Sequence, residues 1–337
     1  MSGVPKILGA GSILQDLLVH VSDEFLRSHV PGEKGGRLIV SSSELDDLLA
    51  EAEKTAPCVR CPGGSTANTV RALAGLGVRT SFLCKTGADP AGAFLRESFL
   101  SDGAGADSFK TDPVLPTGRC LCLISPDSER TMRVVPGAAG NLTEEDLAEK
   151  DFEGVTHLHA EGYLLSAFPF LRRIVALAAD HACTVSFDLS SFEVVRQFRT
   201  ELEELLRGGA VDVLFANETE GAAFSGLRDV RATLDFMAGF CRTAVVKTGA
   251  DGAWIRQEGE TFHIAAESVP VTDTTGAGDL WQAGFLYGFV RGRTPEFCGA
   301  AGAAMAGEVI RHTGAVIPAS RRGALRERLR AMESAGL

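Results

Sequence analysis

The second half of the chain alternates between short apolar segments and helical segments, and this rhythm constrains the fold more than any other feature. The apolar segments are rich in β-branched residues, which is typical of buried strands. The predicted strands are Val155–His159, Thr184–Phe187, Val211–Phe215 and Ala244–Lys247, and helices between them begin near Pro169, Thr200 and Glu218. Such alternation indicates βαβ units. It predicts an α/β fold with a doubly wound, mostly parallel sheet and helices on both faces.

Several apolar segments in the first half of the chain do not fit a parallel sheet. They are short and separated by turn residues, and two of them flank a hairpin turn at 126–129: Leu17–Val21, Arg37–Val40, Cys120–Ile124 and Thr131–Val135. Alternating segments of this kind favour a small β-sheet. We therefore expect one domain over residues 1–337, with a small β-sheet lid formed by discontinuous segments at about 12–42 and 108–136.

Charge and hydropathy limit the possible partners. The 337 residues carry a formal net charge of −11, which disfavours a nucleic-acid partner because phosphate backbones bind basic surfaces. We see no uninterrupted apolar stretch of membrane-spanning length, and residues 1–6 lack the core of a signal peptide. We expect a cytoplasmic protein with no membrane partner. The sequence leaves open whether it is a monomer or a homodimer.

The eight cysteines are scattered through apolar segments, which is typical of free, reduced thiols. Cys58 and Cys61 form a CxxC motif, but no second pair of ligands follows at short spacing. Zinc sites need such a pair, and redox sites place the motif at a helix start. We therefore expect neither zinc nor redox chemistry at this motif.

The heptapeptide Asp273–Asp279 (DTTGAGD) precedes a long apolar helical segment. Glycines at a helix start leave backbone N–H groups free to approach an anion, and the helix dipole adds to the attraction. Asp279 lies in the first turn of the same helix, so a general base would stand beside the anion site, as phosphoryl transfer to an alcohol requires. The alternative is a loop that allows tight helix packing, with Asp279 interacting only with the helix dipole.

A second glycine pair, Gly63 and Gly64, precedes Asn68 at the start of another predicted helix. Glycines permit close backbone approach to a ligand, and asparagine offers both a donor and an acceptor to sugar hydroxyls. The alternative is a tight turn with Ser65 as the helix cap. Asp16 follows the first predicted strand, at the carboxyl edge where α/β sheets bind ligands. Its carboxylate could hold a diol, or it could be an ordinary loop residue.

Two further strand ends carry polar residues. Asn217 and Glu220 follow the strand Val211–Phe215, and an acidic group at a strand end suits a hydrated Mg²⁺ ion. The same residues fit a helix capping box, and both interpretations hold together. Thr248 and Gly249 follow another strand and form a turn that could reach phosphates. A P-loop kinase is excluded because no GxxxxGK[ST] pattern exists.

With these motifs, the chain resembles the ribokinase-like (PfkB) kinase family over nearly its whole length. The resemblance implies ATP and Mg²⁺ as cofactors and does not decide whether K⁺ is required. It implies that Asp279 is the catalytic base and that Gly276, Ala277 and Gly278 form an anion hole. It further implies three groups of binding residues: Asp16, Gly63, Gly64 and Asn68 for the substrate; Thr248, Gly249 and Thr274 for the nucleotide; and Asn217 and Glu220 for magnesium and phosphates.

Within the family, the segments Pro116–Gly118, Val211–Glu220 and Ile310–Gly314 resemble those of adenosine kinases. We therefore expect an ATP-dependent kinase that phosphorylates a primary hydroxyl of an adenosine-like nucleoside. Candidate aromatic platforms for the base are Phe168, Phe170 and Phe192, each of which also fits a core position. The alternative is a PfkB-family sugar kinase for fructose, ribose or a ketodeoxy sugar acid. A lid that presents Arg or Lys to a carboxylate would favour the sugar acid.

Overall fold

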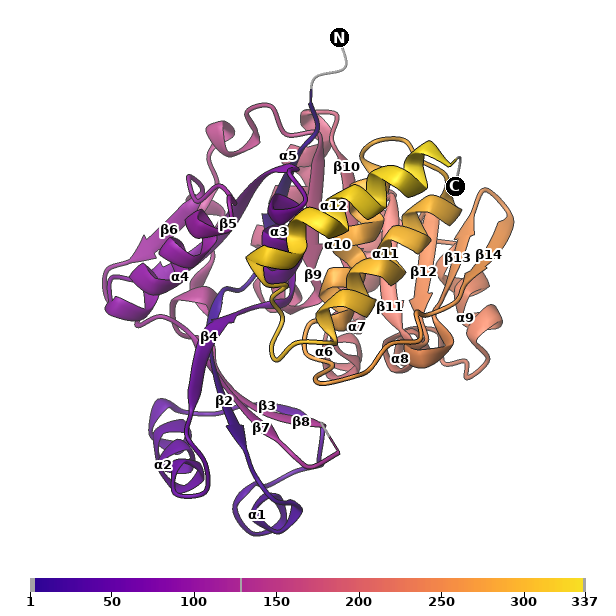
Figure 1. Ribbon diagram of the computed structural model, residues 1–337. Helices are drawn as coiled ribbons and strands as arrows, with labels where there is room; N and C mark the ends of the chain where they lie inside the picture. Colours follow the sequence, from indigo (N-terminus) through magenta and orange to yellow (C-terminus); the bar gives the residue numbers. More distant parts are fainter. Residues whose placement is uncertain (1–3, 128, 336–337) are drawn as a thin grey trace.

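The structure, a computed structural model, describes residues 4–127 and 129–335. Residues 1–3 of the N-terminal segment and Ser128 in the turn of the expected hairpin lie outside the described residues. A large sheet covered by helices forms the body of the molecule, and a smaller sheet projects from one end of it (Figure 1).

The large sheet has nine strands in the order β14-β13-β12-β11-β10-β9-β1-β5-β6. All neighbours from β12 through β6 are parallel, and β13 and β14 add an antiparallel hairpin at one edge. The strands are β1 (Lys6–Ala10), β5 (Arg79–Gly87), β6 (Phe109–Asp112), β9 (His157–Glu161), β10 (Thr184–Asp188), β11 (Val213–Asn217), β12 (Thr243–Lys247), β13 (Ala253–Gln257) and β14 (Glu260–Ile264). The predicted mostly parallel sheet is confirmed.

Helices cover both faces of this sheet because its strands are apolar on both sides. In β1, Ile7 packs into the layer of α3 (Ser65–Gly75), α10 (Ala277–Phe289), α11 (Pro295–Val309) and α12 (Ala319–Ser334). The next residue, Leu8, packs into the opposite layer of α5 (Phe168–Asp180), α6 (Phe192–Gln197), α7 (Arg199–Arg207), α8 (Glu218–Ser225) and α9 (Val230–Met237). Figure 1 shows α3, α10, α11 and α12 in front of the sheet. A further helix, α4 (Pro90–Ser101), packs beside α3, and short 3-10 turns connect the other elements.

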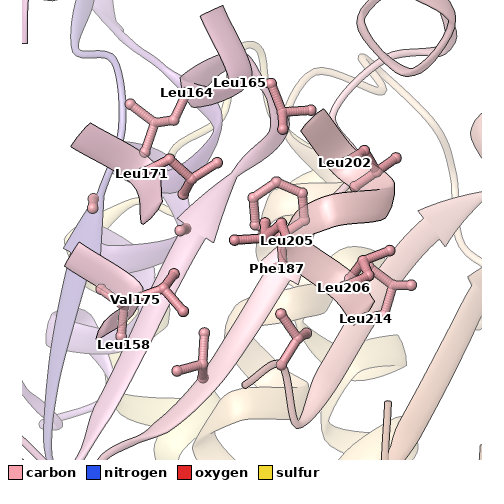
Figure 2. Close-up of a cluster of buried hydrophobic side chains, with 14 of the residues drawn as sticks. Leu158, Leu164, Leu165, Leu171, Val175, Phe187, Leu202, Leu205, Leu206 and Leu214 are labelled. Carbon is pink, nitrogen blue, oxygen red and sulfur yellow. The ribbon is translucent and has the colours of Figure 1, made fainter. Parts of the chain in front are cut away.

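The core behind the sheet is built mainly from leucines of α5 and α7 packed on β9, β10 and β11. Figure 2 shows Phe187 of β10 between Leu171 of α5 and Leu205 of α7. The segment Gly162–Asp180, which includes α5, is long and apolar enough to cross a membrane by length and composition alone, and half of the most apolar window is buried. Its buried side chains belong to this core, which explains its apolar character without a membrane.

The small sheet has five strands in the order β3-β8-β7-β2-β4, and helices α1 (Asp23–His29) and α2 (Ser42–Glu53) accompany it (Figure 1). Its strands are β2 (Leu14–His20), β3 (Arg37–Ile39), β4 (Val59–Gly63), β7 (Arg119–Ile124) and β8 (Arg130–Val135). The predicted hairpin is present, because β7 and β8 pair in antiparallel register.

The boundaries expected for this sheet need two corrections. The segment 43–63 also belongs to it, since β4 pairs with β2. The Pro and Gly residues of β4 argue against a strand, but proline is tolerated at a sheet edge, where β4 lies. Conversely, β6 falls within the expected segment 108–136 but pairs with β5 in the large sheet.

Helices α10 and α11 cross so closely that glycine is required at the contact. A Cβ atom built on Gly284 would lie 2.2 Å from the carbonyl oxygen of Ala301. We expect Gly284→Ala to lower the free energy of unfolding by about 1–3 kcal/mol, the usual cost of overpacking. The matched control is Gly323→Ala in α12, where a Cβ meets no atom within 4 Å and alanine favours the helix by about 1 kcal/mol. Equal unfolding midpoints in urea for the two variants would contradict this packing argument.

Candidate active site

A cavity of about 260 Å³ lies between the small sheet and the carboxyl edge of the large sheet. Parallel strands end at the same edge, so residues that follow different strands meet there. The large sheet contributes Glu161, Asp188, Asn217 and Lys247, from the ends of β9 to β12, and the small sheet contributes Asp16, Cys120, Cys122, Arg130, Met132 and Val134. The starts of α3 and α10 complete the wall. The sequence-predicted site residues in this wall are Asp16, Gly64, Asn68, Asn217, Glu220, Thr274, Gly276, Ala277, Gly278 and Asp279.

The Asp279 carboxylate is held by the start of α3 on the other side of the cavity. Ser65 Oγ donates to one carboxylate oxygen at 2.7 Å, and Asn68 Nδ2 donates to the other at 2.9 Å. Ser65 does not cap α3, as the alternative interpretation required: Gly64 is at the N-cap and no side chain caps the helix. Burial raises the pKa of Asp279 above its ordinary value, and these two hydrogen bonds act against that rise. The Asp279 carboxylate is therefore fixed in orientation by two side-chain donors.

The loop before α10 owes its shape to Asp273. One carboxylate oxygen accepts from the Thr275 N–H at 2.8 Å and from its hydroxyl, while the other accepts from the Gly314 N–H at 2.7 Å. Gly276 takes a positive φ of 74°, where a side chain would also collide with Ala315. Gly276, Ala277 and Gly278 line the cavity, but the Ala277 N–H donates to the Thr274 carbonyl at 3.1 Å. An anion site here therefore rests on the N–H groups of Gly276 and Gly278.

Asp16 lies within β2 of the small sheet, not after the first strand at the edge of the large sheet as we expected. Gly63 is needed beside it, because a Cβ at Gly63 would lie 2.0 Å from the Asp16 carboxylate. Burial raises the pKa of Asp16 to about 7, although Arg130 acts to lower it. The carboxyl group thus faces Asp279 across the cavity, at the position where an acceptor hydroxyl could bind.

Gly64 lets two chain segments meet at the rim of the cavity. Its φ is 110°, and a side chain there would lie 2.2 Å from the Ser12 carbonyl oxygen. Asn68 uses its amide nitrogen on Asp279, while its buried Oδ1 has no partner among the described residues. That oxygen is available to accept a hydrogen bond from a substrate hydroxyl.

The helix-cap interpretation of Asn217 and Glu220 is confirmed, and the magnesium interpretation stays a prediction. Asn217 caps α8, and its backbone and side-chain nitrogens donate to Glu220 at 2.7 and 2.8 Å in a capping box. Glu220 is nevertheless buried in the cavity wall, where burial, followed by the charge of Asp188, raises its pKa to about 7. Asp188, Glu220 and Asp279 line one cavity, but their oxygens do not form a close ligand cluster among the described residues. A Mg²⁺ ion, which keeps several of its waters, would therefore reach them through those waters.

Several site residues were not foreseen from the sequence: Ser65, Arg130, Glu161, Asp188 and Lys247. Lys247 forms an ion pair with Asp188 at 3.3 Å, and a Cβ on Gly278 would lie 3.4 Å from its amine. Burial acts to lower the pKa of Lys247, but Asp188, Glu220 and Asp279 outweigh it and hold the pKa above its ordinary value. The signal available in the sequence was a charged residue at the end of each apolar strand.

The residues predicted to bind the nucleotide separate into two groups. Thr274 lies in the cavity wall, whereas Thr248 and Gly249 are not among its lining residues. Thr248 begins a tight turn after β12, in which its N–H donates to the Gly252 carbonyl at 2.8 Å. Gly249 has a φ of 57° in that turn. A contact of Thr248 or Gly249 with a nucleotide stays a prediction.

The aromatic residue in the cavity wall is Tyr163, which follows β9. Phe170 is 1% exposed in the core, Phe168 packs against the same core, and Phe192 lines a neighbouring hollow. The Arg37 guanidinium lies 4.4 Å from the centre of the Tyr163 ring, a distance at which a cation and a ring attract. This contact joins the small sheet to the body of the molecule.

All eight cysteines are free thiols, and the expectation that Cys58 and Cys61 do not chelate zinc stays a prediction. Cys120 and Cys122 face the cavity from β7 with their sulfur atoms 3.5 Å apart. The hydrogen bond with Cys120, followed by burial, holds the pKa of Cys122 well above its ordinary value, so this thiol is protonated and contributes chiefly surface to the cavity.

The fold and the site together define a ribokinase-like α/β enzyme. A family model described as pfkB family carbohydrate kinase matches residues 39–322, so the chain belongs to this family of phosphotransferases, which act on hydroxyl groups. Adenosine kinase from Dictyostelium discoideum is 27% identical over 94% of this chain and 97% of its own length. Fructokinase from Klebsiella pneumoniae is 30% identical over 77% and 87%. The crystal structure of adenosine kinase from Sinorhizobium meliloti is 29% identical, with a TM-score of 0.89 over 97% of this chain and 100% of the other.

The hydrogen bond from Ser65 to Asp279 generates a pH-dependent prediction. A base must be ionised to accept a proton, so turnover falls as the pH drops through the pKa of Asp279. Ser65→Ala removes a donor that favours the ionised form, and this loss raises the pKa. We expect the acid limb of the pH profile of kcat to move to higher pH. Ser98→Ala, which removes a hydrogen bond within α4, is the control, and an unmoved limb in Ser65→Ala would count against the assignment.

Proposed function

We propose that this PfkB-family kinase transfers the γ-phosphoryl group of ATP to a primary hydroxyl of a nucleoside with an adenosine-like base. The observation that carries the proposal is the Asp279 carboxylate, held by Ser65 and Asn68 beside the glycine loop and facing Asp16 across the cavity. Relatives named adenosine kinase match almost the whole chain, which supports a nucleoside over a free sugar.

The proposed mechanism follows from the placement of charges. Asp16 and Asn68 Oδ1 accept hydrogen bonds from acceptor hydroxyls and direct the reacting hydroxyl at Asp279. Asp279 then takes the hydroxyl proton as the new phosphate ester bond forms. The N–H groups of Gly276 and Gly278 stabilise charge on the transferred group, and the charged Lys247 amine lies against that loop. Asp188 and Glu220 would hold Mg²⁺ through its waters, which supplies charge neutralisation when bound.

The specificity for the nucleobase is proposed from the remaining wall of the cavity. Tyr163 offers the aromatic face, and Leu14, Met132 and Val134 of the small sheet offer an apolar surface opposite it. An aromatic base can stack on a tyrosine ring with its centre several ångströms away. For this to occur, the nucleobase must displace the Arg37 guanidinium that covers the Tyr163 ring.

A second candidate function is supported by the two arginines of the small sheet. Arg37 and Arg130 both line the cavity. Burial acts to lower the pKa of Arg130, but Cys122, Asp16 and Asp279 together hold it above its ordinary value. Two cations on the lid side would suit the carboxylate of a ketodeoxy sugar acid, because guanidinium groups bind carboxylates in a two-pronged geometry.

The first test replaces the Asp279 carboxylate with an amide of the same shape. We expect Asp279→Asn to lower kcat by roughly a hundredfold to ten-thousandfold, the usual contribution of a general base, while calorimetry still detects adenosine binding. The contrasting variant is Glu220→Gln, whose lost activity a higher Mg²⁺ concentration should partly restore. Near-normal turnover in Asp279→Asn would remove Asp279 from the role of base.

The second test compares acceptors by a coupled assay of ADP formation. We expect kcat/KM for adenosine to exceed that for inosine, ribose, fructose and a ketodeoxy sugar acid. A nucleobase adds apolar surface worth about 25 cal/mol per Å² buried. Hydroxyls mainly exchange hydrogen bonds to water for hydrogen bonds to the protein, with a small net gain. A sugar acid that exceeds every nucleoside, with this advantage lost in Arg37→Met, would establish the second candidate instead.

A further inference from the structure

One buried carboxyl group contacts both of the N-terminal chain segments that join the two sheets. Glu161 ends β9 at the centre of the large sheet and is 0% exposed. Its Oε1 accepts a hydrogen bond from the Ser12 N–H at 2.8 Å, and its Oε2 accepts one from the Thr66 N–H at 2.9 Å. Each oxygen therefore has a backbone donor from a different segment.

The first of these segments leads from β1 into β2. A Cβ at Gly11 would lie 2.5 Å from the Glu161 carboxyl carbon, so the chain passes directly over this group. Asp16, the proposed acceptor-binding carboxylate, follows four residues after Ser12. The position of β2 above the cavity is thus tied to β9 by one hydrogen bond.

The second segment leads from β4 into α3. Thr66 lies in the first turn of α3, next to Ser65 and two residues before Asn68, which are the two donors that hold Asp279. Figure 1 shows β2 and β4 running together between the two sheets, and they pair in antiparallel register. Both segments therefore enter the small sheet from points fixed by the same side chain.

We propose that Glu161 is a positioning residue that acts through Ser12 and Thr66. It sets the distance between the segment that holds the acceptor, which carries Asp16, and the segment that orients the base, which carries Ser65 and Asn68. Since both oxygens are occupied by backbone donors, its role differs from that of a substrate ligand. The effect on turnover rests on the proposed function, whereas the effect on the backbone does not.

The charge state of Glu161 supports this role. Two N–H donors favour an ionised carboxylate, while burial raises its pKa to about 7. A neutral amide of the same shape has only one acceptor oxygen. In Glu161→Gln, one of the two N–H groups must face the amide NH₂, so one segment loses its anchor while the volume of the core is preserved.

Amide hydrogen exchange of the unliganded full-length protein tests the inference directly. In Glu161→Gln we expect the exchange of the Ser12 or the Thr66 amide to accelerate by roughly tenfold to a hundredfold, the equivalent of losing one hydrogen bond to a charged group. Glu161→Asp, whose shorter side chain keeps the charge but moves the oxygens back, should show the same effect. It also serves if the glutamine variant does not fold.

The matched control is Asp212→Ala, which removes both carboxylate oxygens. Asp212 Oδ2 accepts from the Val185 N–H at 2.7 Å, so this variant disturbs a carboxylate–backbone bond at the opposite end of the large sheet. In this control, amide hydrogen exchange at residues 11–13 and 64–66 should equal that of the wild type. Its KM for the acceptor should also be unchanged. If the changes in the Glu161 variants came only from a general loss of stability, this control would show the same changes.

The kinetic readout separates positioning from stability. In the Glu161 variants we expect KM for the acceptor to rise severalfold and kcat to fall, with KM for ATP unchanged. Unchanged exchange at both Ser12 and Thr66 overturns the inference, and so does accelerated exchange with unaltered kcat and KM for the preferred acceptor of the panel. If that acceptor is a sugar, the nucleoside proposal fails while the role of Glu161 is tested on the sugar in the same way.

Discussion

The concentration of carboxyl groups at one edge of a parallel sheet is the constraint on which the rest of this structure depends. Glu161 and Asp188 end neighbouring strands, Glu220 lies in the first turn of the helix after the next strand, and each is at most 5% exposed. Burial is the main cause that raises the pKa of Glu161 and of Glu220 to about 7, and neighbouring carboxylates add to it. Buried charges cost free energy unless they are paired or hydrogen-bonded. Lys247, Arg130 and the backbone N–H groups of three chain segments supply that compensation, and together they shape the cavity.

This arrangement also explains how the site divides its tasks between two bodies. The large sheet and α10 supply Asp279, the glycine loop and the acidic residues proposed to hold magnesium. The small sheet supplies Asp16, Arg37, Arg130 and the apolar side chains that face the acceptor. Differences in acceptor between relatives named adenosine kinase and fructokinase are therefore expected in the small sheet, where few residues contact the large one.

The fold could be predicted from the sequence because strands and helices alternate with clear periodicity, and the glycine loop with Asp279 could be predicted because its spacing is specific. Asp16 fell within the expected lid segment 12–42, but its place inside β2 was not predicted because single-chain patterns do not reveal which strands pair. Ser65 was taken as an alternative helix cap, a local role, while its partner is 214 residues away. Asp188, Lys247 and Glu161 have no motif, and their importance comes only from the meeting of strand ends. Tyr163 was not among the aromatic candidates, because its place in the cavity wall follows only from its position after β9.

The order of strands has a consequence for synthesis on the ribosome. β2 lies beside β7, whose residues follow about a hundred positions later, and β1 lies between β5 and β9. The first 63 residues therefore contain two strands of the small sheet with an unpaired edge. These strands cannot pair with all their neighbours until residue 135 has left the ribosome. Contacts this distant in sequence slow folding and leave apolar strands uncovered in the nascent chain. The helices α1 and α2, with their own side-chain caps at Ser22 and Ser41, can form at once and shield one face of these strands during that interval.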